Sequence, residues 1–363
     1  MTPPPCPQRL PIEAAAISAL SRHRLRLGIA ATAAFLGLLF WQAGCGAGSE
    51  TPGATPTNQG TTPIPQPTLP AQQQLPVDLV LGQQGSGPGE FNEPGGLAVD
   101  SQGNLYVADI MNHRVQKFDA AGKFVAQVGG NGEGEGQFTE PWGLAVDGEG
   151  NVYVADSFNH RIQKFDPDLN FLLAFGKSAS NLDDPEPDVF WGPRDVAVDA
   201  DGNIWVADTG TGRMVKYGPD GSLIQPFGDL GEGPGQFKEL TSIEIAPGGD
   251  IFVADSGNRR VQRFDADFKF VAEYAVPGWL YVDSVAKPYL ALLPGGGLIV
   301  SDPTQNKLFR LDSQGNPIAT LDAEGTALAI PRGVAFDSRG FLYVAEAGPD
   351  QVRRLQLSDL TPP

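Results

Sequence analysis

Short apolar segments recur along the chain after residue 77, each of five or six residues and each followed by a polar turn. In the first unit they are Gly96–Asp100, Asn104–Ala108, Arg114–Asp119 and Lys123–Val128. Segments of this length between turns rich in Asp, Asn and Gly predict β-strands. Their apolar runs are nearly continuous, so we expect the strands to be covered on both faces of their sheets.

The four-segment unit is repeated six times, and an acidic residue ends a V-x-D/E signature in each copy. These acids are Asp109, Asp156, Asp208, Asp255, Asp302 and Glu346. They are 47, 52, 47, 47 and 44 residues apart. Four strands in each repeat of this length predict an all-β, six-bladed β-propeller.

The repeats resemble the NHL family, in particular its exported bacterial type. The resemblance rests on the recurring pattern P-x-G-[LV]-A-V-D, V-A-D and R-[VI]-Q-K-F-D over residues 77–358. The triplet that names the family reads Asn112-His113-Arg114 and Asn159-His160-Arg161 here. The resemblance implies a six-bladed propeller but no single activity, since relatives include RNA-binding, enzymatic, kinase-sensor and scaffold propellers.

The sixth unit ends without its outermost strand. The segment Val77–Gly82 matches the outermost strand of the other units, although it precedes the first of them. We therefore predict that it pairs beside Val352–Leu357 and closes the ring, which removes the open ends of the ring.

Residues 1–45 are predicted to be a signal peptide or membrane anchor. Arg22, Arg24 and Arg26 precede an apolar run of 15 residues, Leu27–Trp41. This run suits a signal peptide and is shorter than the roughly 20 residues of a spanning helix. The basic flank should stay in the cytoplasm and place the rest of the chain outside. We expect an exported protein held on the outer side of the cytoplasmic membrane or at the cell surface, or secreted.

Cys45 follows Gln42-Ala43-Gly44, a sequence similar to the lipobox of bacterial lipoproteins, with Gln42 where that motif prefers Leu. Lipidation at Cys45, an uncleaved signal anchor and a cleaved soluble form all remain open. Residues 46–76 are rich in Gly, Pro, Thr and Gln and predict a disordered linker. The propeller is expected over 77–358, with a short tail over 359–363.

The net charge of the protein excludes one class of binding partner. The net charge is −18, and the part after residue 76 has 21 basic and 41 acidic residues, a balance of −20. So acidic a domain repels phosphate backbones, and nucleic acid is not an expected partner. Membrane contact is expected through the N-terminal segment only.

A basic residue recurs five positions after the signature acid. Because the arrangement is repeated, we interpret it as a structural ion pair rather than a ring of catalytic groups. The pairs are Asp109 with Arg114, Asp156 with Arg161, Asp208 with Arg213, and Asp255 with Arg260.

Differences between the blades indicate a ligand site. The residue after the start of each innermost strand should lie near the mouth of the central channel, and it reads Gly95, Trp142, Arg194, Thr241, Pro288 and Arg332. Trp142, Arg194 and Arg332 are therefore predicted to bind a protein or a small anionic ligand. His113 and His160, at equivalent positions in adjacent blades, are further candidates.

Two functions follow from these observations. We favour a non-enzymatic binding or scaffold propeller exposed on the cell envelope. The alternative is a propeller lyase or hydrolase with a site in the central channel. No cofactor, metal ion or catalytic residue is predicted, because two histidines cannot supply the three or four ligands that zinc sites use.

Overall fold

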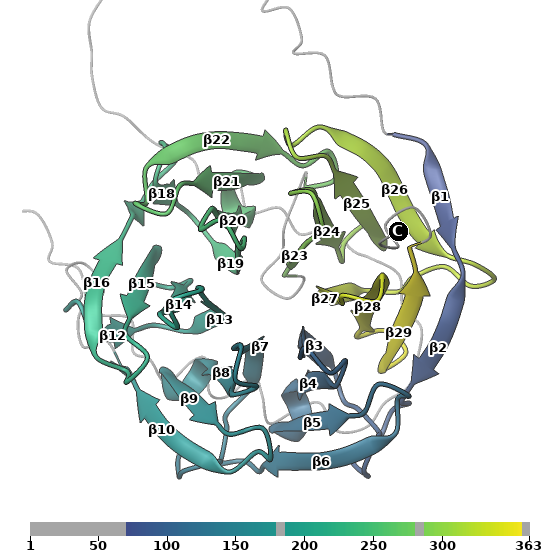
Figure 1. Ribbon diagram of the computed structural model, residues 1–363, viewed down its shortest axis with the longest axis horizontal. Helices are drawn as coiled ribbons and strands as arrows, with labels where there is room; N and C mark the ends of the chain where they lie inside the picture. Colours follow the sequence, from purple (N-terminus) through teal and green to yellow (C-terminus); the bar gives the residue numbers. More distant parts are fainter. Residues whose placement is uncertain (1–69, 179–185, 280–286, 358–363) are drawn as a thin grey trace, which may run out of the picture. The chain divides into compact units, whose positions relative to one another are not determined.

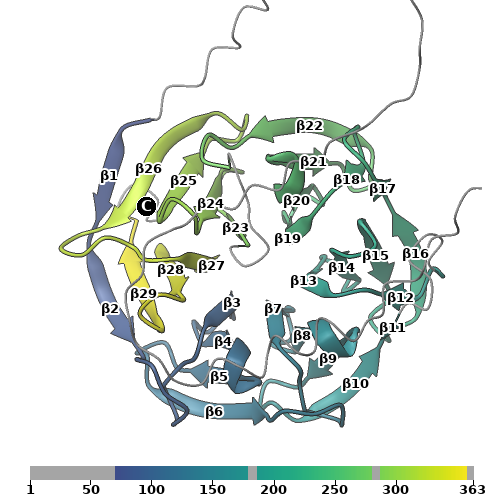
Figure 2. The same ribbon diagram turned by 180° about the vertical axis from the view of Figure 1, so that it is seen from behind.

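The computed structural model describes residues 70–178, 186–279 and 287–357. Six sheets of four or five strands surround a central axis (Figure 1). The predicted all-β, six-bladed fold is confirmed. The view from behind gives the same order of blades (Figure 2).

Blades 1 to 5 each contain four antiparallel strands that follow one another in chain order from the channel outward. Blades 1 to 3 comprise β3 (Pro94–Val99), β4 (Leu105–Asp109), β5 (Arg114–Phe118) and β6 (Phe124–Gly129); β7 (Pro141–Val146), β8 (Val152–Asp156), β9 (Arg161–Phe165) and β10 (Phe171–Phe175); and β13 (Pro193–Val198), β14 (Ile204–Asp208), β15 (Arg213–Tyr217) and β16 (Leu223–Phe227).

The remaining blades follow the same plan, with additions at the edges of the last two. Blades 4 to 6 comprise β19 (Leu240–Ile245), β20 (Ile251–Asp255), β21 (Arg260–Phe264) and β22 (Phe270–Ala275); β23 (Leu290–Leu292), β24 (Leu298–Asp302), β25 (Lys307–Leu311) and β26 (Pro317–Ala323); and β27 (Pro331–Phe336), β28 (Phe341–Glu346) and β29 (Gln351–Gln356).

Short elements lie in the connections. Two-residue parallel pairs join β11 (Lys177–Ser178) to β12 (Val189–Phe190) and β17 (Asp229–Leu230) to β18 (Gln236–Phe237). Single turns of 3₁₀ helix follow the second strand in three blades, at η2 (Ile110–Asn112), η3 (Ser157–Asn159) and η4 (Ser256–Asn258). No helix of the described residues is both long and apolar enough to cross a lipid bilayer.

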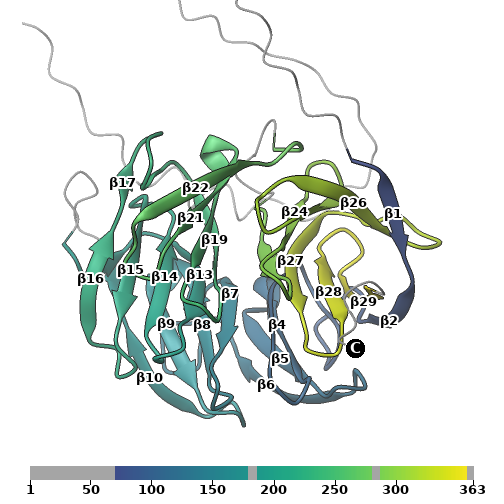
Figure 3. The same cartoon turned by 45° about the horizontal axis from the view of Figure 1, so that its top comes forward.

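The N-terminal closure is confirmed. Strand β2 (Val77–Leu81) pairs antiparallel with β29, with Val77 opposite Leu355 and Leu81 opposite Val352. A second strand, β1 (Gln72–Leu75), pairs in parallel with β26 and gives blade 5 a fifth strand. Both strands follow the outer side of the last two blades (Figure 3).

The linker predicted over 46–76 is therefore too long, and ordered structure begins five residues before the expected boundary at residue 77. The error has a physical reason: only one residue of β1 is apolar, and it is fully buried. That residue, Leu75, lies in the cluster between blades 5 and 6 that also contains Leu357. The predicted signal, Cys45 and the tail 359–363 lie outside the described residues.

The hydrophobic core lies between the blades. Tyr106 of blade 1 packs with Val152 and Val154 of blade 2 in one cluster, and equivalent clusters fill the other seams. The second strand of a blade is buried along its whole length, as in β4 and β8. Burial on both faces explains the continuous apolar runs, because each sheet is packed between two neighbours.

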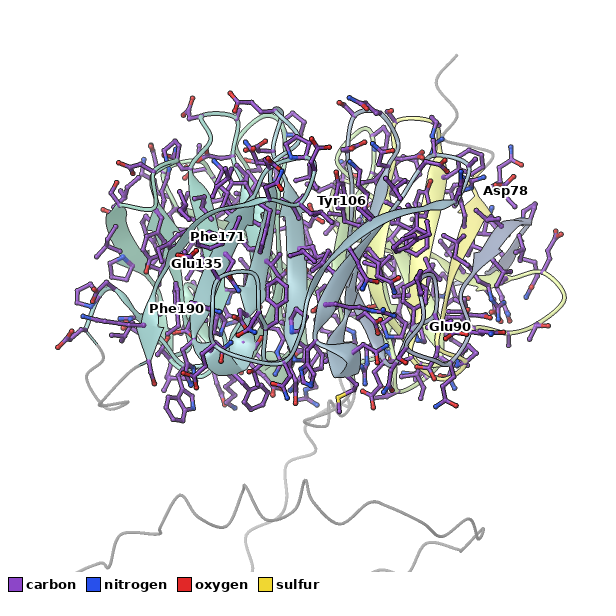
Figure 4. All side chains as sticks on the ribbon, turned by 90° about the horizontal axis from the view of Figure 1, so that it is seen from below. Asp78, Glu90, Tyr106, Glu135, Phe171 and Phe190 are labelled. Carbon is purple, nitrogen blue, oxygen red and sulfur yellow. The ribbon has the colours of Figure 1, made fainter. Side chains whose placement is uncertain are left out.

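The two ends of the ring differ. The innermost strands begin, and the second strands end, on one face, since Pro94 pairs with Asp109 and Pro141 with Asp156. We call this the mouth face. Glu90 and Phe190, in connections that lead to the innermost strands, lie toward it in Figure 4, with Tyr106 nearer the opposite face.

Candidate functional site

The repeated acids hold the connections between blades. Asp109 Oδ1 accepts a hydrogen bond from the backbone N–H of Asn92 at 2.7 Å, and Oδ2 accepts one from Arg114 Nε at 2.7 Å. Arg114 in turn donates to the backbone carbonyls of Ser86, Gly87 and Glu90, each at 2.8 Å. One buried pair therefore orders a loop of the preceding connection, whose polar backbone groups need partners.

Two further blades repeat this ion pair at nearly the same distance. Arg161 Nε is 2.8 Å from Asp156 Oδ2, and Arg260 Nε is 2.9 Å from Asp255 Oδ2. In blade 3, Arg213 donates to the backbone carbonyls of Glu186 and Val189. Burial raises the pKa of Asp109 and Asp156, and it raises that of Asp208 to about 6.

Blade 6 reaches the same arrangement with different residues. Gln351 occupies the usual place of the arginine and donates to Glu346 at 2.8 Å. Arg353, two positions further along β29, places its Nε 2.6 Å from Glu346 Oε2. The pairing is thus kept where the sequence pattern is broken, which fits an architectural role.

The two candidate histidines also join neighbouring blades. His113 Nδ1 accepts from the backbone N–H of Glu140 at 3.3 Å, and His160 Nδ1 accepts from that of Gly192 at 3.2 Å. His160 also stacks on Trp191, with ring centroids 4.9 Å apart. Both hydrogen bonds run to connections between blades and not to the channel. Among the described residues, no three His, Cys, Asp or Glu side chains gather as a metal site.

The other three candidates come together at the channel mouth. The guanidinium carbon of Arg194 lies 3.9 Å from the centroid of the Trp142 ring, and that of Arg332 lies 5.4 Å from it. Trp142, Arg194 and Arg332 are the second residues of β7, β13 and β27, so equivalent positions of three blades converge. Blade 1, between blades 6 and 2, presents only Gly95 at this position.

Two more residues complete the group. Thr241 is the second residue of β19, and Tyr289 immediately precedes β23. Burial raises the pKa of Tyr289, with the charge of Asp195 acting in the same direction and those of Arg194 and Arg332 opposing it. We call Trp142, Arg194, Thr241, Tyr289 and Arg332 the mouth cluster.

Most polar atoms of the mouth cluster lack partners among the described residues. Seven buried atoms make no hydrogen bond there: Trp142 Nε1, Arg194 Nε and Nη1, Thr241 Oγ1, Tyr289 Oη, and Arg332 Nε and Nη1. The one ion pair of the group joins Arg332 Nη2 to Glu93 Oε2 at 3.0 Å. Unsatisfied buried donors are costly, and they commonly mark a place where a ligand or water completes the hydrogen bonding.

Electrostatics points to a negatively charged ligand. Burial lowers the pKa of Arg194, and the neighbouring charge of Arg332 lowers it further, while Glu140 and Glu239 act in the opposite direction. Glu239 is already paired with Lys287. Two guanidinium groups beside one aromatic ring therefore repel each other, and an anion between them would relieve the repulsion.

A cavity of about 320 Å³ lies along the axis of the ring. The innermost strands of all six blades line it, mostly with small and aliphatic side chains. Its polar side chains are those of Asp195, Glu244 and Tyr289. Tyr289 thus belongs both to the mouth cluster and to the cavity wall.

Comparison with known proteins agrees with this architecture. The family profile described as NHL repeat matches residues 91–118, 138–165 and 190–217, which are parts of three successive units. The chain therefore contains three NHL repeats within its six-bladed propeller. The three matched segments include the connection and first three strands of blades 1 to 3, and the structure shows the same four-stranded plan in all six blades.

Individual relatives share only short segments with this NHL-repeat protein. The B-box type zinc finger protein ncl-1 of Caenorhabditis elegans is 43% identical over 56 residues, which cover 15% of this chain and 7% of that protein. The chain thus matches less than a tenth of that relative's length.

Two enzymes share the fold at low sequence identity. A streptogramin B lyase has a TM-score of 0.53 at 16% identity, covering 77% of this chain and 97% of that one. A gluconolactonase of Xanthomonas campestris has a TM-score of 0.55 at 18% identity, covering 79% and 98%. At these identities the similarity describes the fold alone.

Proposed function

We propose that this NHL-repeat propeller is a non-enzymatic binding module that takes a carboxylate-bearing ligand at its mouth cluster. The observation that supports the proposal is the set of seven buried polar atoms without partners beside two arginines. All seven of these atoms can donate hydrogen bonds, and a carboxylate is an acceptor only. Guanidinium groups bind carboxylates through paired hydrogen bonds, which suits this class of ligand.

The proposal also includes an exported location, with the propeller outside the cytoplasmic membrane and the N-terminal segment as its anchor. Arg22–Trp41 supports it through the basic flank and the apolar run. A ligand site on a mouth face that is exposed to the envelope could receive an acidic side chain of a protein or a free organic acid.

Binding is tested with hexanoate as the probe and the full-length protein in mild detergent. Trp142 lies in the site, so a change in tryptophan fluorescence should accompany binding. We expect the double substitution R194A/R332A to weaken hexanoate binding by at least about a hundredfold, because it removes two or more charged hydrogen bonds of roughly 1.5–3 kcal/mol each. Isothermal titration calorimetry provides the affinities.

The matched control is R263A/R339A, which removes two positive charges from ion pairs with Asp250 and Asp337, remote from the mouth face. It should bind hexanoate as the wild type does. The unfolding temperature of R194A/R332A should stay close to that of the wild type. In the wild type the buried guanidinium groups of Arg194 and Arg332 lack most of their hydrogen-bond partners, so their removal breaks few interactions. Equal hexanoate binding by R194A/R332A and wild type would overturn the proposed site.

A further inference from the structure

Glu244 is a carboxyl group in the channel without a partner. It lines the central cavity, and no hydrogen bond or ion pair joins it to any described residue. Burial raises its pKa to about 8, and the neighbouring charge of Asp195 contributes in the same direction. The effect of burial indicates a carboxylate for which the protein supplies no counter-charge.

The repeat makes this residue exceptional. In the pairing of the first two strands, Glu244 lies opposite Phe252. The same register position in the other five blades is occupied by alanine: Ala98, Ala145, Ala197, Ala291 and Ala335. The propeller fold therefore accommodates a small side chain at this position, and a carboxylate there is not needed for the ring to form.

Asp195, together with Tyr289 of the mouth cluster, lies between Glu244 and the two arginines. Asp195 accepts hydrogen bonds from the backbone N–H groups of Val196 at 3.0 Å and Ile243 at 3.1 Å, and its charge acts on both Glu244 and Tyr289. The Tyr289 side chain is 3% exposed, and its hydroxyl has no partner among the described residues. A buried, unpartnered hydroxyl on the wall of the same cavity is an independent sign that a ligand belongs there.

The charges of the channel are thus ordered along its axis. Arginines lie at the mouth, Tyr289 and Asp195 follow, and Glu244 lies deeper. Glu244 is three residues beyond Thr241 of the mouth cluster on the same strand, a rise of about 10 Å. The cavity of about 320 Å³, whose wall includes Tyr289, Asp195 and Glu244, is large enough for a short aliphatic chain.

We infer that the ligand is zwitterionic, with its carboxylate on Arg194 and Arg332 and a primary ammonium group on Glu244. This inference rests on the proposed function and names the class of its ligand. A metal ion is a poorer occupant of the inner position, since no three acidic, His or Cys side chains gather among the described residues. An ammonium group needs only a few oxygen acceptors, which the carboxylates of Glu244 and Asp195 can supply.

Three probes of one chain length separate the two ends of the site: 6-aminohexanoate, hexanoate and hexylammonium. Calorimetry on the full-length protein should show 6-aminohexanoate binding at least tenfold more tightly than hexanoate. The substitution Glu244→Gln should abolish that advantage and leave hexanoate binding unchanged. The double substitution R194A/R332A should weaken both hexanoate and 6-aminohexanoate.

Glu135→Gln is the control for Glu244→Gln, because it neutralises an exposed acid of a connecting loop (Figure 4) and should leave all three probes unaffected. If hexanoate binds through the arginines but the amino group adds nothing, the zwitterion inference is overturned and the proposed function stands. If no probe binds, both are overturned. Binding of Ca²⁺ that depends on Glu244, without any ammonium preference, would replace the inferred ligand with a metal ion.

Discussion

Protonation of Glu244 is coupled to folding, because its carboxyl group lies in the channel with no counter-charge. Its folded pKa of about 8 lies above the ordinary value of 4.5, so the folded protein binds this proton more tightly than the unfolded chain. The associated stability is complete below the ordinary pKa and is lost as the pH rises through the folded pKa. Asp195, with a pKa raised by burial to about 7, acts in the same direction.

We therefore expect Glu244→Gln to stabilise the protein at pH 8.5 and to change little at pH 5. One pKa unit corresponds to about 1.4 kcal/mol, and partial exposure to the channel reduces the full effect, so about 2 kcal/mol is a realistic gain. This corresponds to a rise of roughly 4 °C in the unfolding temperature. Circular dichroism melts at the two pH values measure it; parallel pH profiles for variant and wild type would show that Glu244 is not titrating in the channel.

Comparing the repeats with one another was enough to predict part of the site. Trp142, Arg194 and Arg332 differ from their equivalents in other blades, and the structure brings them together. Glu244 replaces an alanine that the other five blades have at this register position, but the repeat pattern alone does not indicate which side chains of the innermost strands face the channel. Tyr289 could not be predicted from the repeat, because blade 5 departs most from it and its innermost strand is only three residues long.

At the scale of single elements, the segment Gln72–Leu81 connects two blades across the closure of the ring. Its first half is the fifth strand of blade 5, and its second half is the outermost strand of blade 6. The backbone N–H of Glu324 donates to the carbonyl of Leu75 at 2.9 Å, and that of Gln356 to the carbonyl of Pro76 at 3.0 Å. One strand of this segment could be predicted because it completed a repeat, and the other could not because nothing in the repeat calls for it.

Leu75 should therefore contribute to the stability of the closed ring. It is fully buried in the seam between blades 5 and 6, and large-to-small substitutions in such positions cost about 2–4 kcal/mol. We expect Leu75→Ala to lower the unfolding temperature by roughly 4–8 °C. Gln74→Ala, on the exposed neighbour in the same strand, is the control and should melt like the wild type. Equal melting of the two variants would mean that β1 does not hold the seam.

At the scale of the whole molecule, a positively charged mouth lies in a strongly acidic protein. The balance of −20 after residue 76 repels anions at long range, whereas the two arginines attract them at one point. Such an arrangement favours a small ligand or one acidic side chain over a polyanion. Salt should affect binding little once the carboxylate is buried between the guanidinium groups, because buried pairs are screened less than exposed ones.

The proposed anchor determines where this site operates, and Cys45 offers the most direct test. If Cys45 is lipidated, Cys45→Ala should abolish labelling by a fatty-acid analogue in a bacterial host and release the protein from the membrane fraction. Cys6→Ala is the matched control, since Cys6 precedes the apolar run and is the only other cysteine. A single acyl chain gives only weak attachment, so lipidation with more than one chain is needed for stable retention. Retention without labelling in the wild type would instead favour a signal anchor formed by Leu27–Trp41.

Protease added to intact spheroplasts tests the proposed export itself. The propeller should be accessible to the protease in both anchored forms, and complete protection would overturn the proposed export.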